Sequence, residues 1–265
     1  MNEIFIAIIM GIVEGLTEFL PVSSTGHMII TGHFFAFEGE RADTFKIVIQ
    51  LGAVLAVVVL YWRRFLGFFN FSPSNFRRPG INLIHVVLAM LPFMIGGVTI
   101  YGYIKQVLFG PAPVMISLVL GGILMIIADR VKRPITAETM DDITYKQAIG
   151  IGLFQCFALW PGFSRSGSTI SGGMLLGTSQ KAAAEFTFIV AVPIMFAATG
   201  YDLYKSRDIL SMDDLGLFIA GLVSAFVVAL LAIVTFLNVV KKLRLSWFAY
   251  YRFVVAGVIG IILYW

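Results

Sequence analysis

The hydrophobic positions of this chain fall into long runs that short polar segments separate. Crossing a bilayer takes about 20 apolar residues in a helix. Six runs approach or exceed that length, at residues 45–62, 83–104, 113–130, 182–204, 214–238 and 248–265. The first run closes on Tyr61 and Trp62, a pair typical of a membrane interface. The pattern therefore predicts an all-α, polytopic membrane protein with six transmembrane helices.

Two further apolar segments are each broken near the middle. Residues 4–20 and 24–36 are expected to form two helices, because Pro21 ends the first and the second is too short to span. Residues 147–160 and 164–178 repeat this pattern around a Pro-Gly pair. Non-helical backbone at membrane depth is tolerated only inside protein or beside a watery cavity. We therefore expect two re-entrant helix–loop–helix pairs, each entering and leaving on one side.

The two broken pairs indicate an internal repeat within a single membrane domain of residues 1–265. An offset of 141 residues aligns Gly11 with Gly152, Glu14 with Gln155, and Gly26 with Gly167. The halves, roughly 1–130 and 131–265, each hold one re-entrant pair and three spans. Because three is odd, the second copy is expected to be inverted in the membrane. Broken helices that meet at such an axis form the binding sites of transporters.

Composition supports a membrane protein and gives its expected orientation. The chain is 59% hydrophobic and 13% charged, whereas a soluble domain carries about 25% charged residues. The modest net charge of +4 gives no reason to expect a nucleic-acid partner. Loops 63–82, 130–146 and 239–247 hold 11 Lys and Arg, against 5 in the other three loops, and are predicted to be cytoplasmic. The first re-entrant pair would then enter from outside.

Polar side chains concentrate at the first broken pair. Glu14 and Glu18 lie four residues apart, so they share one face of a helix. Ionisable groups in a membrane segment are functional by default, although the same pair on a soluble helix would mean little. The hydroxyl residues that follow stand where a second helix begins, and helix N-termini bind phosphate. Carboxylates beside phosphate need a cation between them, so Glu14 and Glu18 are candidate ligands of a divalent metal ion.

The second broken pair brings hydroxyls and a guanidinium but no acid. Arg165 offers a planar fork that matches phosphate oxygens, and its Pro-Gly-broken surroundings argue against a residue that merely snorkels to the interface. The two pairs are chemically complementary, so both turns are expected to meet at one phosphate site. The candidate substrate-binding residues are Ser23, Thr25, Gly26, Ser164, Arg165, Ser166, Gly167 and Thr169.

Two segments carry a resemblance to a known family. EGLTEFLPVSSTGHM, residues 14–28, and LWPGFSRSGSTISGGMLLG, residues 159–177, resemble the bacterial undecaprenyl pyrophosphate phosphatases of the bacitracin-resistance type. The resemblance covers the whole chain. It implies hydrolysis of the lipid pyrophosphate to undecaprenyl phosphate and inorganic phosphate, which recycles the cell-wall carrier lipid and confers resistance to bacitracin. It also implies a divalent cation, Mg²⁺ or Ca²⁺, and a bacterial inner-membrane site open to the external, periplasmic face.

The resemblance places Glu14, Glu18, Ser24, His27 and Arg165 at the active site. We assign Ser24 as the nucleophile and His27, one helical turn on, as general base or proton donor. The swapped roles, with His27 as nucleophile, stay open. A lipid-phosphate transporter or flippase of the same architecture is the alternative function, although an anion carrier has little use for a buried acid pair. A homodimer also stays open.

Overall fold

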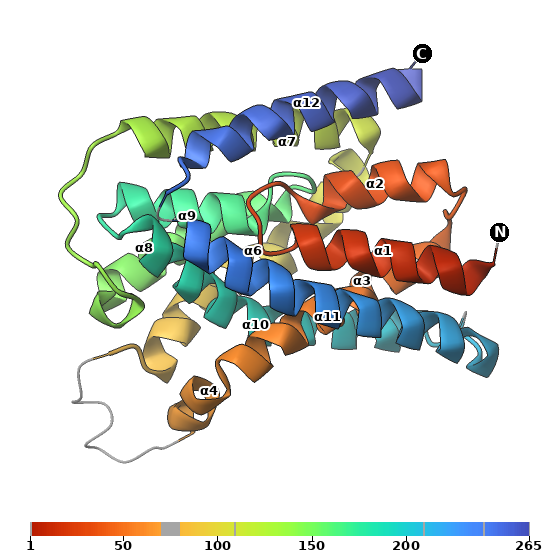
Figure 1. Ribbon diagram of the computed structural model, residues 1–265, viewed down its shortest axis with the longest axis horizontal. Helices are drawn as coiled ribbons and strands as arrows, with labels where there is room; N and C mark the ends of the chain where they lie inside the picture. Colours follow the sequence, from red (N-terminus) through yellow and green to blue (C-terminus); the bar gives the residue numbers. More distant parts are fainter. Residues whose placement is uncertain (1, 70–79, 109, 209, 241, 265) are drawn as a thin grey trace.

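The computed structural model is a bundle of helices that lie roughly along one direction (Figure 1). It describes residues 2–69, 80–108, 110–208, 210–240 and 242–264. Part of the predicted loop 63–82, with Arg77 and Arg78, falls outside these residues. The described α-helices are α1 (Glu3–Thr17), α2 (Ser24–Phe34), α3 (Glu40–Leu60), α4 (Trp62–Phe68), α6 (Leu83–Val107), α7 (Pro111–Arg130), α8 (Tyr145–Gln155), α9 (Arg165–Leu175), α10 (Gln180–Ser206), α11 (Leu215–Val239) and α12 (Leu245–Tyr264). The 3-10 turns are η1 (Met140–Asp142), η2 (Cys156–Leu159) and η3 (Met212–Asp214).

Six of the described helices are long and apolar enough to cross a membrane, which confirms the all-α fold and the number of spans. They are α3, α6, α7, α10, α11 and α12. The hydropathy pattern located each of them within a few residues, because lipid-facing helices must be apolar over their whole length.

The structure corrects the start of the first span and the beginning of the predicted loop 63–82 that follows it. Helix α3 begins at Glu40 rather than at residue 45, because charged side chains in the first helical turn of α3 form ion pairs. Arg41 pairs with Asp214 at 2.5 Å and with Glu3 at 3.1 Å. Helix α4 also forms within the segment predicted to be loop, where an amphipathic run rich in aromatic residues follows Tyr61.

The second helices of the two broken pairs match at the predicted offset of 141 residues, whereas the first helices differ, since α8 continues into the 3-10 turn η2 and α1 does not. Helices α2 and α9 cover equivalent positions, and each begins after a serine with positive φ, 72° at Ser23 and 73° at Ser164. In Figure 1, α1 and α2 extend from a central turn toward the end where both termini lie, whereas α8 and α9 lie toward the other end. The inversion of the two halves across a membrane stays a prediction.

Small residues let each broken pair approach a spanning helix closely. A Cβ atom on Gly15 of α1 would lie 2.6 Å from the carbonyl oxygen of Ala225 in α11. A Cβ atom on Gly152 of α8 would lie 2.5 Å from the carbonyl oxygen of Ala89 in α6. Helices in lipid associate through close contacts of this kind, because no hydrophobic effect drives them together. The α1–α11 and α6–α8 contacts therefore fix where the two turns lie.

We expect Gly15→Val to destabilise the protein, because its side chain must displace the α11 backbone. Overpacking of this kind costs about 1–3 kcal/mol. The matched control is Gly200→Val in α10, where an added Cβ meets no atom within 4 Å. Thermal unfolding in detergent should show a lower Tm for Gly15→Val than for Gly200→Val. Equal melting temperatures would contradict close α1–α11 packing.

Candidate active site

Glu18 joins two turns at the centre of the bundle. The first turn, residues 18–23, links α1 to α2, and the second turn, residues 156–164, links α8 to α9. It follows α1 directly, and its backbone N–H donates to the carbonyl oxygen of Glu14 at 2.9 Å. The hydroxyl of Ser24, the first residue of α2, donates to Glu18 Oε2 at 2.6 Å. Arg165, the first residue of α9, donates from Nη2 to Glu18 Oε1 at 2.8 Å. Side chains 147 residues apart in sequence therefore meet around one carboxylate.

The backbone before each helix is set for this meeting. Ser23 and Ser164 adopt positive φ, which non-glycine residues rarely do and which clusters at functional sites. Each serine caps the helix that follows it: the Ser23 hydroxyl accepts from the N–H of Gly26, and the Ser164 hydroxyl from the N–H of Gly167. Capping holds the unusual backbone in place. In this backbone conformation the side chain of the next residue, Ser24 or Arg165, lies against Glu18.

Two of the remaining predicted substrate-binding residues, Ser166 and Thr169, form hydrogen bonds that stabilise the second turn. Ser166 donates to the carbonyl oxygen of Leu20 at 2.9 Å, which ties the second turn to the first. Thr169 donates to the carbonyl oxygen of Arg165 at 2.8 Å and accepts from Thr187 of α10 at 2.8 Å. Thr25, in contrast, is exposed at the start of α2. The structure thus holds Arg165 from its own helix and from α10.

Two charged residues at the centre, Glu14 and Arg165, still have side-chain atoms without hydrogen-bond partners among the described residues. Glu14 is fully buried, and neither of its carboxylate oxygens has a hydrogen-bond donor among the described residues. Nη1 of Arg165 is likewise buried without an acceptor in the described part of the chain. An unpaired buried charge costs several kcal/mol or so. The site is therefore built to receive a cation or proton beside Glu14 and an anion beside Arg165.

A divalent cation fits this arrangement with help from a substrate. The described residues contain no cluster of three or more His, Cys, Asp or Glu side chains that would hold a metal by itself. Mg²⁺ is usually bound by one or two carboxylates together with substrate phosphates and waters. Glu14 has both oxygens free for such a role, whereas both Glu18 oxygens already accept hydrogen bonds. Glu14 is therefore the better candidate ligand of the two predicted ones.

His27 forms a hydrogen bond with a residue that the sequence did not indicate. Its Nδ1 lies 2.8 Å from the carbonyl oxygen of Ser23, and its Nε2 lies 2.7 Å from the hydroxyl of Tyr251 in α12. No hydrogen bond joins His27 to Ser24 in the described residues. Tyr251 was missed because a tyrosine in an apolar span is usually at a lipid interface, and 224 residues separate it from His27.

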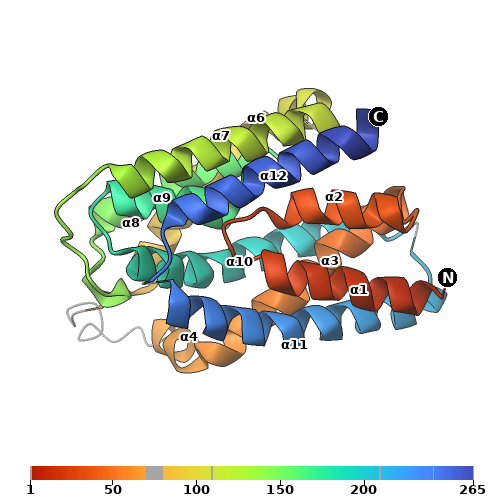
Figure 2. The same cartoon turned by 45° about the horizontal axis from the view of Figure 1, so that its top comes forward.

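Arg252, the next residue of α12, anchors the second turn. It is fully buried, and its guanidinium donates to the carbonyl oxygens of Ser117, Leu118 and Gly162 at 3.1–3.3 Å. A Cβ on Gly167 would lie 2.9 Å from Nη1 of this arginine, so Gly167 makes room for Arg252. An arginine inside a predicted span was the signal that could have identified it. Helix α12 lies beside α7 and also contacts α2, as Figure 2 shows.

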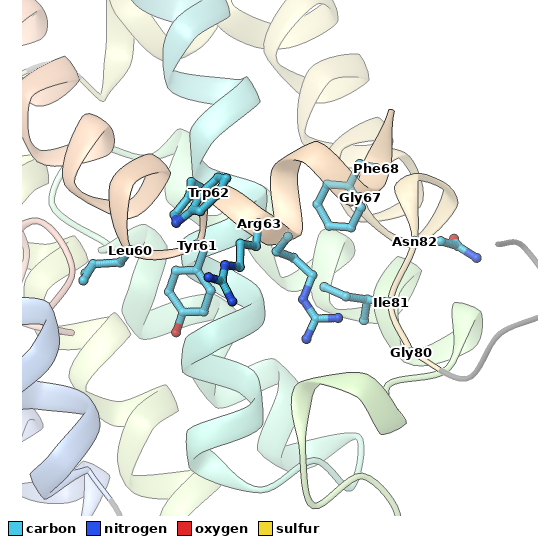
Figure 3. A pocket seen from close by; sticks show the side chains of 10 residues that line it. Leu60, Tyr61, Trp62, Arg63, Gly67, Phe68, Gly80, Ile81 and Asn82 are labelled. Atoms are coloured by element: carbon cyan, nitrogen blue, oxygen red, sulfur yellow. The ribbon is translucent and has the colours of Figure 1, made fainter. Parts of the chain in front are cut away.

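A cavity of 660 Å³ lies away from these residues, around α4 and the start of α6 (Figure 3). Arg63 stands over the ring of Trp62 there at 5.4 Å, and Arg64 forms two 2.7 Å hydrogen bonds with Asp141. Glu18, Ser24 and Arg165 do not line this cavity. Its open volume therefore does not mark the centre where the acid, hydroxyl and guanidinium meet.

Two of the matches to known proteins cover nearly the whole chain. Residues 7–258 match the family model described as bacitracin resistance protein BacA. The chain is 52% identical over 256 residues to undecaprenyl-diphosphatase 1 of Bacillus thuringiensis (strain Al Hakam), an alignment that covers 97% of each protein. Both turns of the candidate site lie within the matched residues.

Proposed function

Since the chain belongs to the bacitracin resistance protein BacA family, we propose that it hydrolyses undecaprenyl pyrophosphate to undecaprenyl phosphate and inorganic phosphate. It is a multi-pass membrane hydrolase of cell-wall lipid recycling and bacitracin resistance. The observation that carries the site assignment is the position of Glu18 between the Ser24 hydroxyl and the Arg165 guanidinium. A nucleophile with an adjacent base, next to a phosphate-binding cation, is what cleavage of a pyrophosphate needs.

Ser24 attacks the terminal phosphorus of the lipid pyrophosphate. Its proton passes to Glu18 Oε2, the acceptor that it already faces at 2.6 Å. The new bond joins Ser24 Oγ to phosphorus, and the bond to the bridging oxygen breaks, which releases undecaprenyl phosphate. Water then attacks the phosphoserine and gives up one proton to the His27 imidazole, the Oγ–P bond breaks, inorganic phosphate leaves, and the proton held on Glu18 returns to Ser24.

Arg165 stabilises charge on the transferred phosphoryl group. Nη2 stays on Glu18 while the unpartnered Nη1 donates to a phosphoryl oxygen. Fixed donors of this kind in a water-poor site typically lower the barrier more than they would in water. The base role predicted for His27 in the first step falls instead to Glu18, because the Ser24 hydroxyl donates to it. His27 remains available for proton transfer with the attacking water.

Glu14 would hold a divalent cation, Mg²⁺ or Ca²⁺, whose other ligands would come from the pyrophosphate and water. Such a cation would neutralise charge on the phosphates when bound. Removal of divalent cations with EDTA should abolish phosphate release, and Glu14→Gln should raise the Mg²⁺ concentration needed for half-maximal rate. Full activity in EDTA would show that hydrolysis needs no divalent cation. Unchanged Mg²⁺ dependence in Glu14→Gln would remove Glu14 as its ligand.

We propose the bacterial inner membrane as the location, with the site open to the external face. The excess of Lys and Arg in loops 63–82, 130–146 and 239–247 supports this orientation. The first turn, which carries Glu18 and Ser24, then faces the outside of the cell.

Ser24→Ala and Glu18→Gln should each lower phosphate release by about 10²–10⁴-fold, because they remove the nucleophile and its base. The measurement is phosphate release from a prenyl pyrophosphate by detergent-purified protein, where no gradient exists to drive a transporter. Ser246→Ala is the control and should leave the rate unchanged. It deletes a hydroxyl that donates a hydrogen bond to Asp129, and neither residue contacts Glu18, Ser24 or Arg165. Near-normal turnover in Ser24→Ala would leave His27 as the nucleophile.

A further inference from the structure

The contact between His27 and Tyr251 joins the first turn to the last helix of the chain. The two rings stack with centroids 5.5 Å apart and planes 12° apart, and the Tyr251 hydroxyl lies 2.7 Å from His27 Nε2. The hydrogen bond spans 224 residues of sequence. A residue so placed can control what a catalytic histidine does without touching the substrate.

The other ring nitrogen determines how this hydrogen bond runs. Nδ1 of His27 lies 2.8 Å from the carbonyl oxygen of Ser23, which can only accept, so Nδ1 carries a proton. His27 has no carboxylate partner among the described residues, and a neutral ring then leaves Nε2 as an acceptor. The Tyr251 hydroxyl is the donor that satisfies it.

We propose that Tyr251 is a positioning residue that holds His27 in the neutral form with its proton on Nδ1. Nε2 is thereby kept unprotonated next to the turn that carries Ser24. The proposal rests on the hydrolase function above, in which His27 takes part in proton transfer with water. It gives this exposed tyrosine, 47% accessible in an apolar helix, a role in the reaction.

The neighbouring residue explains how α12 can supply such a partner. Arg252 fastens α12 to the carbonyl oxygens of α7 and of the second turn. Tyr251, one position earlier, reaches the first turn instead. Consecutive residues of one helix thus contact both turns, so the Tyr251 hydroxyl is held at a fixed distance from His27.

Tyr251→Phe keeps the ring and removes only the hydroxyl, and a hydrogen bond of this kind is worth about 2- to 10-fold in rate. We expect kcat for phosphate release to fall by that factor with little change in KM. Tyr250→Phe is the matched control, because that tyrosine contacts Trp247 and Phe253 rather than His27. In a His27→Ala background, Tyr251→Phe should cause no further loss. An equal loss with and without His27 would overturn the proposal.

Nitrogen NMR of ¹⁵N-histidine-labelled protein tests the same contact without activity. The chain has three histidines, so His33→Gln and His85→Gln variants assign the His27 signals. The wild type should show Nδ1 protonated and Nε2 unprotonated, with the Nε2 signal moved in Tyr251→Phe and unmoved in Tyr250→Phe. A proton on Nε2 in the wild type would overturn the proposal. Absence of phosphate release by the wild type would instead contradict the hydrolase function, whatever the tautomer of His27.

Discussion

A carboxylate buried in an apolar helix bundle must be satisfied by donors, and Glu18 receives one donor from each of the two turns. Replacing Arg165 would leave the Glu18 carboxylate without its ion pair, which costs several kcal/mol or so in a medium of low polarity, whereas replacing Ser24 would remove one of its two hydrogen bonds. The same requirement makes the two halves of the chain meet at one point. Close helix packing through Gly15 and Gly152 brings the turns near, and the charge pairing fixes their final position.

The two turns end in the same way, in a serine with positive φ before a helix, but they differ in chemistry. At the offset of 141 residues, Ser24 corresponds to Arg165, and each is the first residue of an 11-residue helix behind a serine with positive φ. Glu14 corresponds to Gln155, which is buried but uncharged. Similar helix starts therefore present a hydroxyl, the proposed nucleophile, on one side and a guanidinium on the other. Pyrophosphate cleavage uses both, since one group attacks the phosphorus and the other neutralises its oxygens.

Much of this arrangement could be predicted from the sequence, because membrane helices obey strong local constraints. Hydropathy located the six spans, and the unusual density of Glu14, Glu18, Ser24, His27 and Arg165 in broken apolar segments indicated the site. The start of α3 was misplaced since its charges are paired by partners distant in sequence, Glu3 and Asp214.

Contacts made between distant side chains could not be predicted in the same way. The pairing of Ser24 with Glu18 rather than with His27 depends on the path of the Pro21 turn, which local propensities do not determine. Tyr251 carries no local signal, because tyrosine in a span is ordinary. Only the packing around Glu14 reveals that its two carboxylate oxygens have no hydrogen-bond donor among the described residues.

We propose that Arg165 uses the two arms of its guanidinium differently, with Nη2 on Glu18 and Nη1 on the phosphates. Lysine keeps the positive charge but lacks the fork, so it can supply only one of these contacts in a fixed geometry. The direct measurement is kcat/KM for a prenyl pyrophosphate in Arg165→Lys, with Tm as a folding control. Arg64→Lys, which alters a forked contact with Asp141 away from the site, is the matched comparison. Severe loss in Arg165→Lys beside normal kcat/KM in Arg64→Lys is the predicted result, and full activity in Arg165→Lys would contradict a shared active site built on that fork.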